Sequence, residues 1–183
     1  MRRLQRTRRG NLATLWLHGA SRAAPANGKG TEVEKLLYAF WKRDAEPADA
    51  VRQRFVRELK PRIAALGAER LQISIADFTD MTGTLVNFTL QATTPRPDGI
   101  VCFWLTSAWR REPVERLLRE LFPRIAGYVV AESTVLPNVK HPSREDERGF
   151  GFSQITFIQV PPRLTFDEWR RIWFNEHTSV GID

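Results

Sequence analysis

Short apolar runs alternate with two amphipathic segments between residues 33 and 136, and this alternation restricts the fold more than any other feature. The first amphipathic segment is PADAVRQRFVRELKPRIAALG, in which apolar residues recur at spacing four: Val51, Phe55, Leu59 and Ile63. This spacing predicts a helix with one buried face, and the opening proline suits the first helical turn, whose N–H groups have no intrahelical partner. The second segment, PVERLLRELFPRIAG, predicts a helix of the same kind.

The apolar runs have the length and pattern of β-strands. Strict alternation of apolar and polar residues in LQISIADF predicts a strand with one buried face. Three further runs are more continuously apolar: EKLLYAFW, GIVCFWLTS and GYVVAESTVL. The resulting order, β-α-β-β-α-β, predicts an α+β domain at residues 32–138 with a ferredoxin-like βαββαβ sandwich, whose helices leave one face of the sheet bare. The segment TDMTGTLVNFTLQATTPRPDG stays open between an added hairpin and a long loop.

The strand-then-helix pattern begins again after a polar loop. A strand is predicted in FSQITFIQV, and a helix in TFDEWRRIWFNEHTSV. This helix opens with a capping box, in which the Thr165 hydroxyl and the Glu168 carboxylate each accept a hydrogen bond from an otherwise unpaired backbone N–H. Residues 150–183 are therefore predicted to be the first strand and helix of a second, incomplete repeat.

Alignment of the two halves supports a repeat. In the strands the offset is 119 residues, which places Phe157 opposite Tyr38. In the helices the offset is 118 residues, which places His177 opposite Leu59. The second half is thus one loop residue shorter than the first.

The positive charge of the chain is concentrated near its N-terminus. Residues 1–30 carry seven basic side chains and no acidic one, whereas the other 153 residues carry 21 of each sign. The folded part is therefore neutral by count, which argues against a basic nucleic-acid-binding domain. Its composition predicts that the N-terminal segment, residues 1–31, is a disordered basic segment. Two other interpretations stay open, a twin-arginine export signal and a start site placed too far upstream.

Several classes of protein and site are not expected. No apolar stretch approaches the roughly 20 residues of a membrane helix, so no membrane partner is predicted. The single cysteine, Cys102, rules out an internal disulfide and is predicted to be a buried strand thiol in a cytoplasmic protein. His141 lies beside three carboxylates in a polar loop without a second histidine at metal spacing, so neither a metal nor another cofactor is predicted.

One segment, RGFGFSQI at residues 148–155, resembles the RNP1 signature of RNA-recognition motifs, whose aromatic residues stack on bases. That signature requires a strand about 40 residues upstream, where this chain has the helix PVERLLREL. Ser153 and Ile155 also replace the usual valine and aromatic residue. RNA binding is therefore the weaker alternative, and Gly149 and Gly151 are interpreted as part of a loop that leads into a strand.

His177 falls on the apolar face that Phe166, Trp169 and Trp173 form at helical spacing. A lone histidine on such a face is often a hydrogen-bonded core residue. An imidazole among tryptophans also has the composition of a pocket that holds a flat aromatic substrate beside a base, and it needs little pKa tuning to act near neutral pH. Both interpretations stay open at this point.

Several stretches closely resemble the EthD-domain proteins, a family of the dimeric α+β barrel superfamily: EKLLYAFWKR, FVRELKPRIAALGAERLQISIAD, GYVVAES and PPRLTFDEWRRIWFNEHTSVGID. The resemblance spans residues 33–183, and the W-x-x-x-H spacing of Trp173 and His177 is its most specific element. It implies that two ferredoxin-like halves, from two chains or from one tandem chain, close their sheets into a barrel whose interior is the binding site.

The same resemblance implies an activity on a small aromatic or ketide-like molecule, either of the cofactor-independent monooxygenase type, an oxidoreductase, or of the cyclase or isomerase type. His177 is the candidate base, and the candidate substrate-binding residues are Trp173, Trp169, Trp41 and Trp104. The alternative is a non-catalytic small-molecule-binding or accessory protein on the same barrel.

A tandem member of this family would continue beyond Asp183, so the second half is expected to be truncated. Without its sheet, the face of Phe166, Trp169 and Trp173 would lose the burial that large aromatic side chains normally gain. Self-association of the chain is therefore expected, because a second copy would cover this face.

Overall fold

The computed structural model describes residues 14–17, 33–76, 95–132, 139–142, 144, 147, 149–150 and 155–177. They belong to two compact units. The first, called the four-strand unit below, is Ala20–Gly151, and the second, called the two-strand unit, combines Met1–Gly19 with Phe152–Asp183. Each unit is described by itself.

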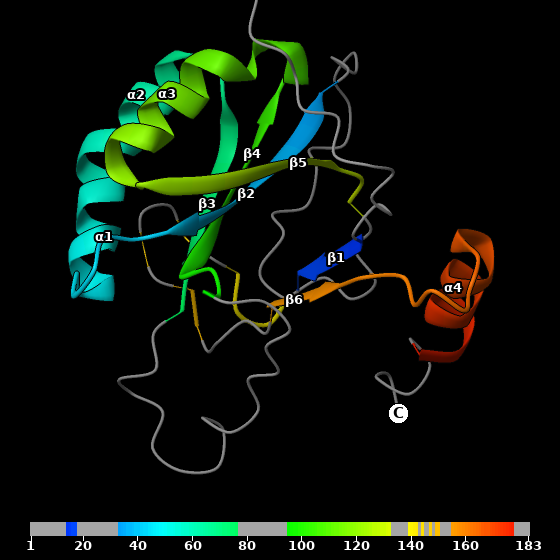
Figure 1. Cartoon of the computed structure of the whole chain (residues 1–183). Coiled ribbons are helices and arrows are strands. Elements are labelled where there is room, and N and C mark those ends of the chain that lie inside the picture. Colours follow the sequence, from blue (N-terminus) through cyan, green and yellow to red (C-terminus); the bar gives the residue numbers. More distant parts are fainter. Residues whose placement is uncertain are drawn as a thin grey trace, which may run out of the picture. The chain divides into compact units, whose positions relative to one another are not determined.

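The four-strand unit contains an antiparallel sheet in the order β3-β4-β2-β5. Its strands are β2 (Glu34–Trp41), β3 (Glu69–Ile75), β4 (Gly99–Leu105) and β5 (Arg124–Val130). Its helical segments are α1 (Ala48–Arg54), η1 (Phe55–Leu59), α2 (Lys60–Ala65), η3 (Ala108–Arg111) and α3 (Glu112–Leu121). Figure 1 shows α1, α2 and α3 gathered on one side of this sheet. The predicted α+β class is confirmed, whereas residues 77–94, which include most of the segment left open between hairpin and loop, lie outside the described residues.

The first predicted helix is present as a continuous helical run from α1 through α2, but its middle, η1, is a π-helical turn. Pro61 is the second residue of α2, which follows this turn directly. Because proline has no N–H, the α-helical bond to the Arg57 carbonyl cannot form, and the ring also crowds that carbonyl.

None of the helices in the part of the chain that the structure describes is long and apolar enough to cross a membrane.

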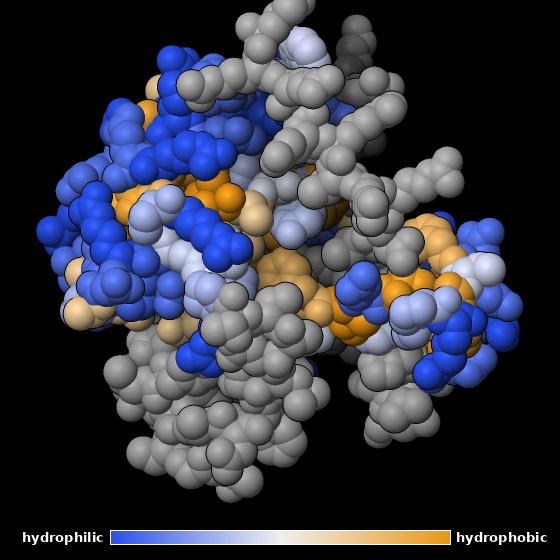
Figure 2. Space-filling view, viewed as in Figure 1, coloured by the Kyte–Doolittle hydropathy of each residue, from blue (hydrophilic) through white to orange (hydrophobic). Residues whose placement is uncertain are grey.

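A hydrophobic core lies between the helices and one face of the sheet, called the first face. The predicted helical face is confirmed, because all four of its residues are buried there: Val51, Phe55, Leu59 and Ile63. Alternate residues of the two central strands meet them: Leu36, Tyr38, Phe40, Val101, Phe103 and Leu105. Figure 2 shows mostly hydrophilic residues over the outer side of the helices, as the amphipathic pattern predicts.

The opposite face of the sheet, called the second face, carries the remaining residues of each strand. Strand register puts Leu37 of β2 beside Cys102 of β4, and Ala39 beside Ile100. These four side chains are buried, although none of them belongs to the core under the helices. The second face was expected to be bare, and it does lack the described helices, but its centre is buried.

The two-strand unit pairs β1 (Thr14–Leu17) antiparallel with β6 (Ile155–Ile158). Strand β1 falls in the segment predicted to be disordered, and these four residues depart from that prediction because their backbone pairs with β6. The helical part consists of α4 (Phe166–Ile172) and the π-helical turn η4 (Trp173–His177).

The capping box predicted at the start of α4 is confirmed. The Glu168 backbone N–H donates to Thr165 Oγ1 over 3.2 Å, and the Thr165 backbone N–H donates to Glu168 Oε2 over 2.8 Å. Two of the N–H groups at the helix start are thereby satisfied.

Candidate functional site

The candidate site is built around Trp104, a half-buried residue of β4 on the second face of the sheet. Register places Trp104 directly opposite Lys35 of β2, and the Lys35 ammonium lies 5.6 Å from the centroid of the indole ring. The guanidinium of Arg70, from β3, lies at the same distance of 5.6 Å from that centroid. Two cations at this range attract the negative face of the indole ring. Together with Glu132, these residues are called the Trp104 cluster.

An irregularity in β3 positions Arg70. The pairing of β3 with β4 shifts register between Glu69 and Gln72, which is a β-bulge or a related irregularity. Arg70 has a φ of 51°, in the left-handed region that side chains other than glycine seldom adopt. Such irregularities redirect side chains and are over-represented beside active sites.

Lys35 is held by an ion pair with Glu132. The lysine side chain is only 8% exposed and the glutamate side chain 28%. A lysine with so little exposure needs a partner, because desolvation of an isolated charge costs several kcal/mol. The pair therefore keeps a positive charge beside Trp104 within a largely apolar face.

Cys102 lies on the second face, and its predicted role as a buried strand thiol is confirmed. Burial raises the pKa of the Cys102 thiol to about 12, Lys35 opposes this rise, and Glu132 adds to it. The thiolate is the nucleophilic form of cysteine, so a thiol with this pKa is inert at neutral pH.

Trp41, a candidate substrate-binding residue with Trp104, occupies the other end of the second face. It is the last residue of β2 and pairs with Arg124 of β5, whereas Trp104 pairs with Lys35. Lys35 and Trp41 are six positions apart along the extended strand, which corresponds to about 20 Å. The two tryptophans therefore share a face but lie at opposite ends of it, and the role predicted for both in substrate binding stays a prediction.

The remaining candidates, Trp169, Trp173 and His177, belong to the two-strand unit. Phe166, Trp169 and Trp173 stack in series, with ring centroids 6.0 Å and 5.9 Å apart. Trp169 is buried and Trp173 is half-buried. The predicted row of aromatic side chains is therefore present along α4 and at the first residue of η4.

His177 is the last residue of η4, and the structure describes its backbone. A π-helical turn forms i→i+5 hydrogen bonds and holds more residues per turn than an α-helix. Residues 173 and 177 are therefore not stacked one regular α-helical turn apart, as the sequence periodicity assumed. The side chain of His177 lies outside the described residues.

The other motifs are His141 and the RNP1-like segment, which lies only partly within the described residues. His141 stacks on Phe150, with ring centroids 4.1 Å apart. Of the RNP1-like segment, Gly149 and Phe150 lie outside any strand and Ile155 begins β6. Within the described ranges, no group of three or more histidine, cysteine, aspartate or glutamate residues is arranged to hold a metal ion.

Lys35, Arg70 and Glu132 are the members of the cluster that the sequence did not indicate. Lys35 and Arg70 stand at the ends of predicted strands and Glu132 within one, and a charged residue in a strand is usually solvated. No sequence signal marks them, because their meeting depends on the order of the strands.

The Trp104 cluster combines an aromatic surface with two cations and one carboxylate.

No known protein-family model matches the chain, and no curated protein matches it in sequence. The resemblance to EthD-domain proteins therefore stays a prediction that rests on the residues quoted above.

Proposed function

We propose that the chain is an EthD-like protein of the dimeric α+β barrel type and that it binds a small aromatic or ketide-like molecule at the Trp104 cluster. The strand order β3-β4-β2-β5, with antiparallel neighbours throughout, supports a ferredoxin-like sandwich. In this proposal the second face lines the barrel interior, and the facing sheet belongs to a second ferredoxin-like half.

The observation that carries the proposal is the placement of Trp104 between Lys35 and Arg70 on a face made mostly of apolar residues. Ligand sites are typically apolar surfaces with a few convergent polar groups. A flat ring gains contact area and stacking against the half-buried indole. A carbonyl or phenolate oxygen on that ring gains from the two cations beside it.

The catalytic form of the proposal adds proton abstraction. This form concerns the two-strand unit by itself: His177 is the candidate base, Trp173 and Trp169 are candidate wall residues beside it, and the imidazole would remove a proton from a carbon next to a carbonyl group. The π-helical turn that ends at His177 supports this form, because single π-helical turns occur frequently at functional sites.

The binding-only form is the second candidate, and the repeat favours it. In the first half, the position equivalent to His177 is Leu59, which is buried in the core under the helices. A histidine at the equivalent core position of the second half would have a structural role and not a catalytic one. Trp41 belongs to neither form of the proposed site, because it lies at the other end of the sheet.

Calorimetric titration of the full chain with 1-naphthol and with anthrone tests the binding site. Replacement of Trp104 by alanine is expected to weaken binding at least tenfold, about 1.4 kcal/mol. The matched control is Trp109→Ala, because Trp109 is 87% exposed and lies outside the cluster. A folded W104A variant that binds both probes as tightly as W109A would exclude this site.

His177→Gln separates the two forms of the proposal. Lost turnover of a bound ketone with unchanged affinity would support the base, whereas unchanged turnover would dismiss it. Circular dichroism of the variant checks that the replacement leaves the helical content intact.

A further inference from the structure

We propose that a second site, at the Trp41 end of the sheet, binds the phosphate group of a small organic molecule. A surface hollow of about 490 Å³ lies there. Its lining comes from the end of β2 and the turn after it, from the segment before β4, and from the start of β5: Trp41, Lys42, Arg43, Asp44, Ala45, Pro95, Arg96, Asp98 and Arg124. This set is called the Arg124 hollow. Its volume lies in the usual range for small-molecule pockets, roughly 300–1,000 Å³.

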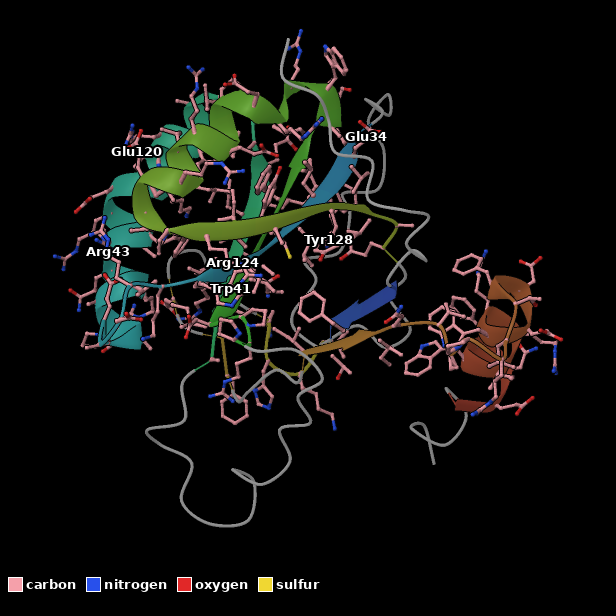
Figure 3. The ribbon with its side chains drawn as sticks, viewed as in Figure 1. Glu34, Trp41, Arg43, Glu120, Arg124 and Tyr128 are labelled. Carbon is pink, nitrogen blue, oxygen red and sulfur yellow. The ribbon has the colours of Figure 1, made fainter. Side chains whose placement is uncertain are left out.

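Arg124 is the centre of the argument. Its guanidinium stacks on the indole ring of Trp41, 4.0 Å from the ring centroid, and Figure 3 shows the two residues together at this end of the sheet. Stacking uses the flat face of the guanidinium and leaves its N–H donors in the plane, at the edge. Among the described residues, the one interaction found for the Arg124 guanidinium is this stacking on Trp41. In the proposal, the N–H donors at its edge bind the phosphate oxygens.

The indole ring is itself fixed. Trp41 Nε1 donates a hydrogen bond to the Pro95 carbonyl oxygen over 3.0 Å. This bond joins the end of β2 to the segment before β4, and it fixes the surface on which Arg124 lies. The arginine is therefore held in place before any ligand arrives, which reduces the entropy that binding would cost.

Asp98 lines the hollow and is held in place by three hydrogen bonds. Its carboxylate accepts a hydrogen bond from the Lys42 backbone N–H over 3.0 Å. Its backbone N–H donates to the Phe40 carbonyl over 2.8 Å, and its carbonyl accepts from the Ala76 N–H over 2.7 Å. These three bonds join Asp98 to the end of β2 and to the residue after β3, and the first of them gives one carboxylate oxygen of Asp98 a structural role.

The charge of the hollow selects an anion. Four basic side chains line it, from Lys42, Arg43, Arg96 and Arg124, against the two carboxylates of Asp44 and Asp98. The net charge of the lining is therefore +2. A phosphate monoester carries about −1.5 to −2 at neutral pH and offers three acceptor oxygens, so it matches this charge better than a carboxylate does.

This site goes beyond the proposed function and does not depend on it. The Arg124 hollow and the Trp104 cluster lie at opposite ends of the sheet, and they share no residue. Failure of one proposal therefore leaves the other standing, and W104A is expected to bind a phosphate ligand like the unmodified chain.

Isothermal titration of the full chain with phenyl phosphate at low ionic strength tests the proposal. Arg124→Gln is expected to weaken binding at least tenfold. The matched control is Arg116→Gln, which removes the same charge from α3 at a residue that does not line the hollow. The control is needed because the basic segment at residues 1–30 attracts anions in every variant. Should R124Q lose its fold by circular dichroism, Arg96→Gln is the substitute and the same tenfold loss is expected.

Three further probes refine the result. Inorganic phosphate is expected to compete with phenyl phosphate, since the phosphate group is the recognised part. Benzoate that binds as tightly as phenyl phosphate would overturn the preference for phosphate. An oligoribonucleotide that binds through Arg124 when phenyl phosphate does not would overturn the assignment to a small molecule, as would equal losses in R124Q and R116Q.

Discussion

Phe55 and Trp173 each begin a π-helical turn of five residues, and they stand 118 residues apart. The α-helices that precede these turns, Ala48–Arg54 and Phe166–Ile172, have the same offset and the same length of seven residues. This is the helical offset that the sequence alignment predicts, so the interpretation as a repeat gains an independent structural observation. Pro61 explains the first turn but has no counterpart at Ser179, so proline is not the shared cause.

The shared geometry also affects how His177 is interpreted. Leu59 ends the first π-helical turn and is buried in the core, and His177 ends the second. An imidazole in place of a core leucine needs a hydrogen-bond partner or access to water. This requirement is the reason to test His177 as a base and as a structural residue with the same variant.

Leu59→Ala is expected to lower the free energy of unfolding by about 2–5 kcal/mol, because it opens a cavity under the helices. Leu66→Ala provides the control, since Leu66 is 45% exposed and its loss is expected to change stability by about 0.5 kcal/mol or less. Chemical denaturation followed by circular dichroism gives both values. Equal effects would show that the π-helical turn does not face the core.

The stability of the chain is expected to fall as the pH rises above about 10, in part through Tyr38. Burial raises the pKa of Tyr38 well above the ordinary value of 10.0, and the hydrogen bond that its hydroxyl donates to Glu115 over 2.9 Å raises it further. The folded chain thus retains a proton that the unfolded chain releases, so this contribution is complete below the ordinary pKa and is lost as pH rises towards the raised one.

Tyr38→Phe removes the titrating group and is expected to flatten the alkaline fall in stability. Tyr128→Phe is the matched control, because it removes the same hydroxyl group from a residue that is 43% exposed. Denaturant titrations at a series of pH values measure both. An alkaline fall of the same steepness in Y38F would rule out the contribution of Tyr38.

Cys102 is expected to react slowly with Ellman's reagent near pH 8 in the native chain and quickly in guanidinium chloride. Its buried thiol has a pKa raised to about 12, so little thiolate is present, and the reagent cannot reach it. The absorbance of the released thiolate follows the reaction. A native rate equal to the denatured rate would contradict the burial of the second face.

Thr165→Ala is expected to destabilise the start of α4 by about 1 kcal/mol, since it removes the acceptor for the Glu168 N–H. Thr165→Ser keeps a hydroxyl and is expected to retain most of the stability. Amide hydrogen exchange over Phe166–Ile172 measures the local effect. If the alanine and serine variants exchange alike, the capping box does not stabilise this helix.

The local elements could be predicted from the sequence because their causes are local. The spacing of Val51, Phe55, Leu59 and Ile63 determines which face of the helix is buried, and Thr165 with Glu168 determines where α4 begins. These patterns act over three or four residues, so they do not depend on what the rest of the chain does.

Which residues make up the two proposed sites depends on the tertiary structure. Lys35 and Glu132 stand 97 residues apart in the chain and meet only because β5 pairs with β2, while Trp104 joins them because β4 pairs with the other edge of β2. The same pairing separates Trp41 from Trp104 and brings Arg124 onto Trp41. The physical reason is that periodicity shows which face of a strand a residue lies on, whereas its neighbours on that face depend on strand order and register, which long-range hydrogen bonds determine.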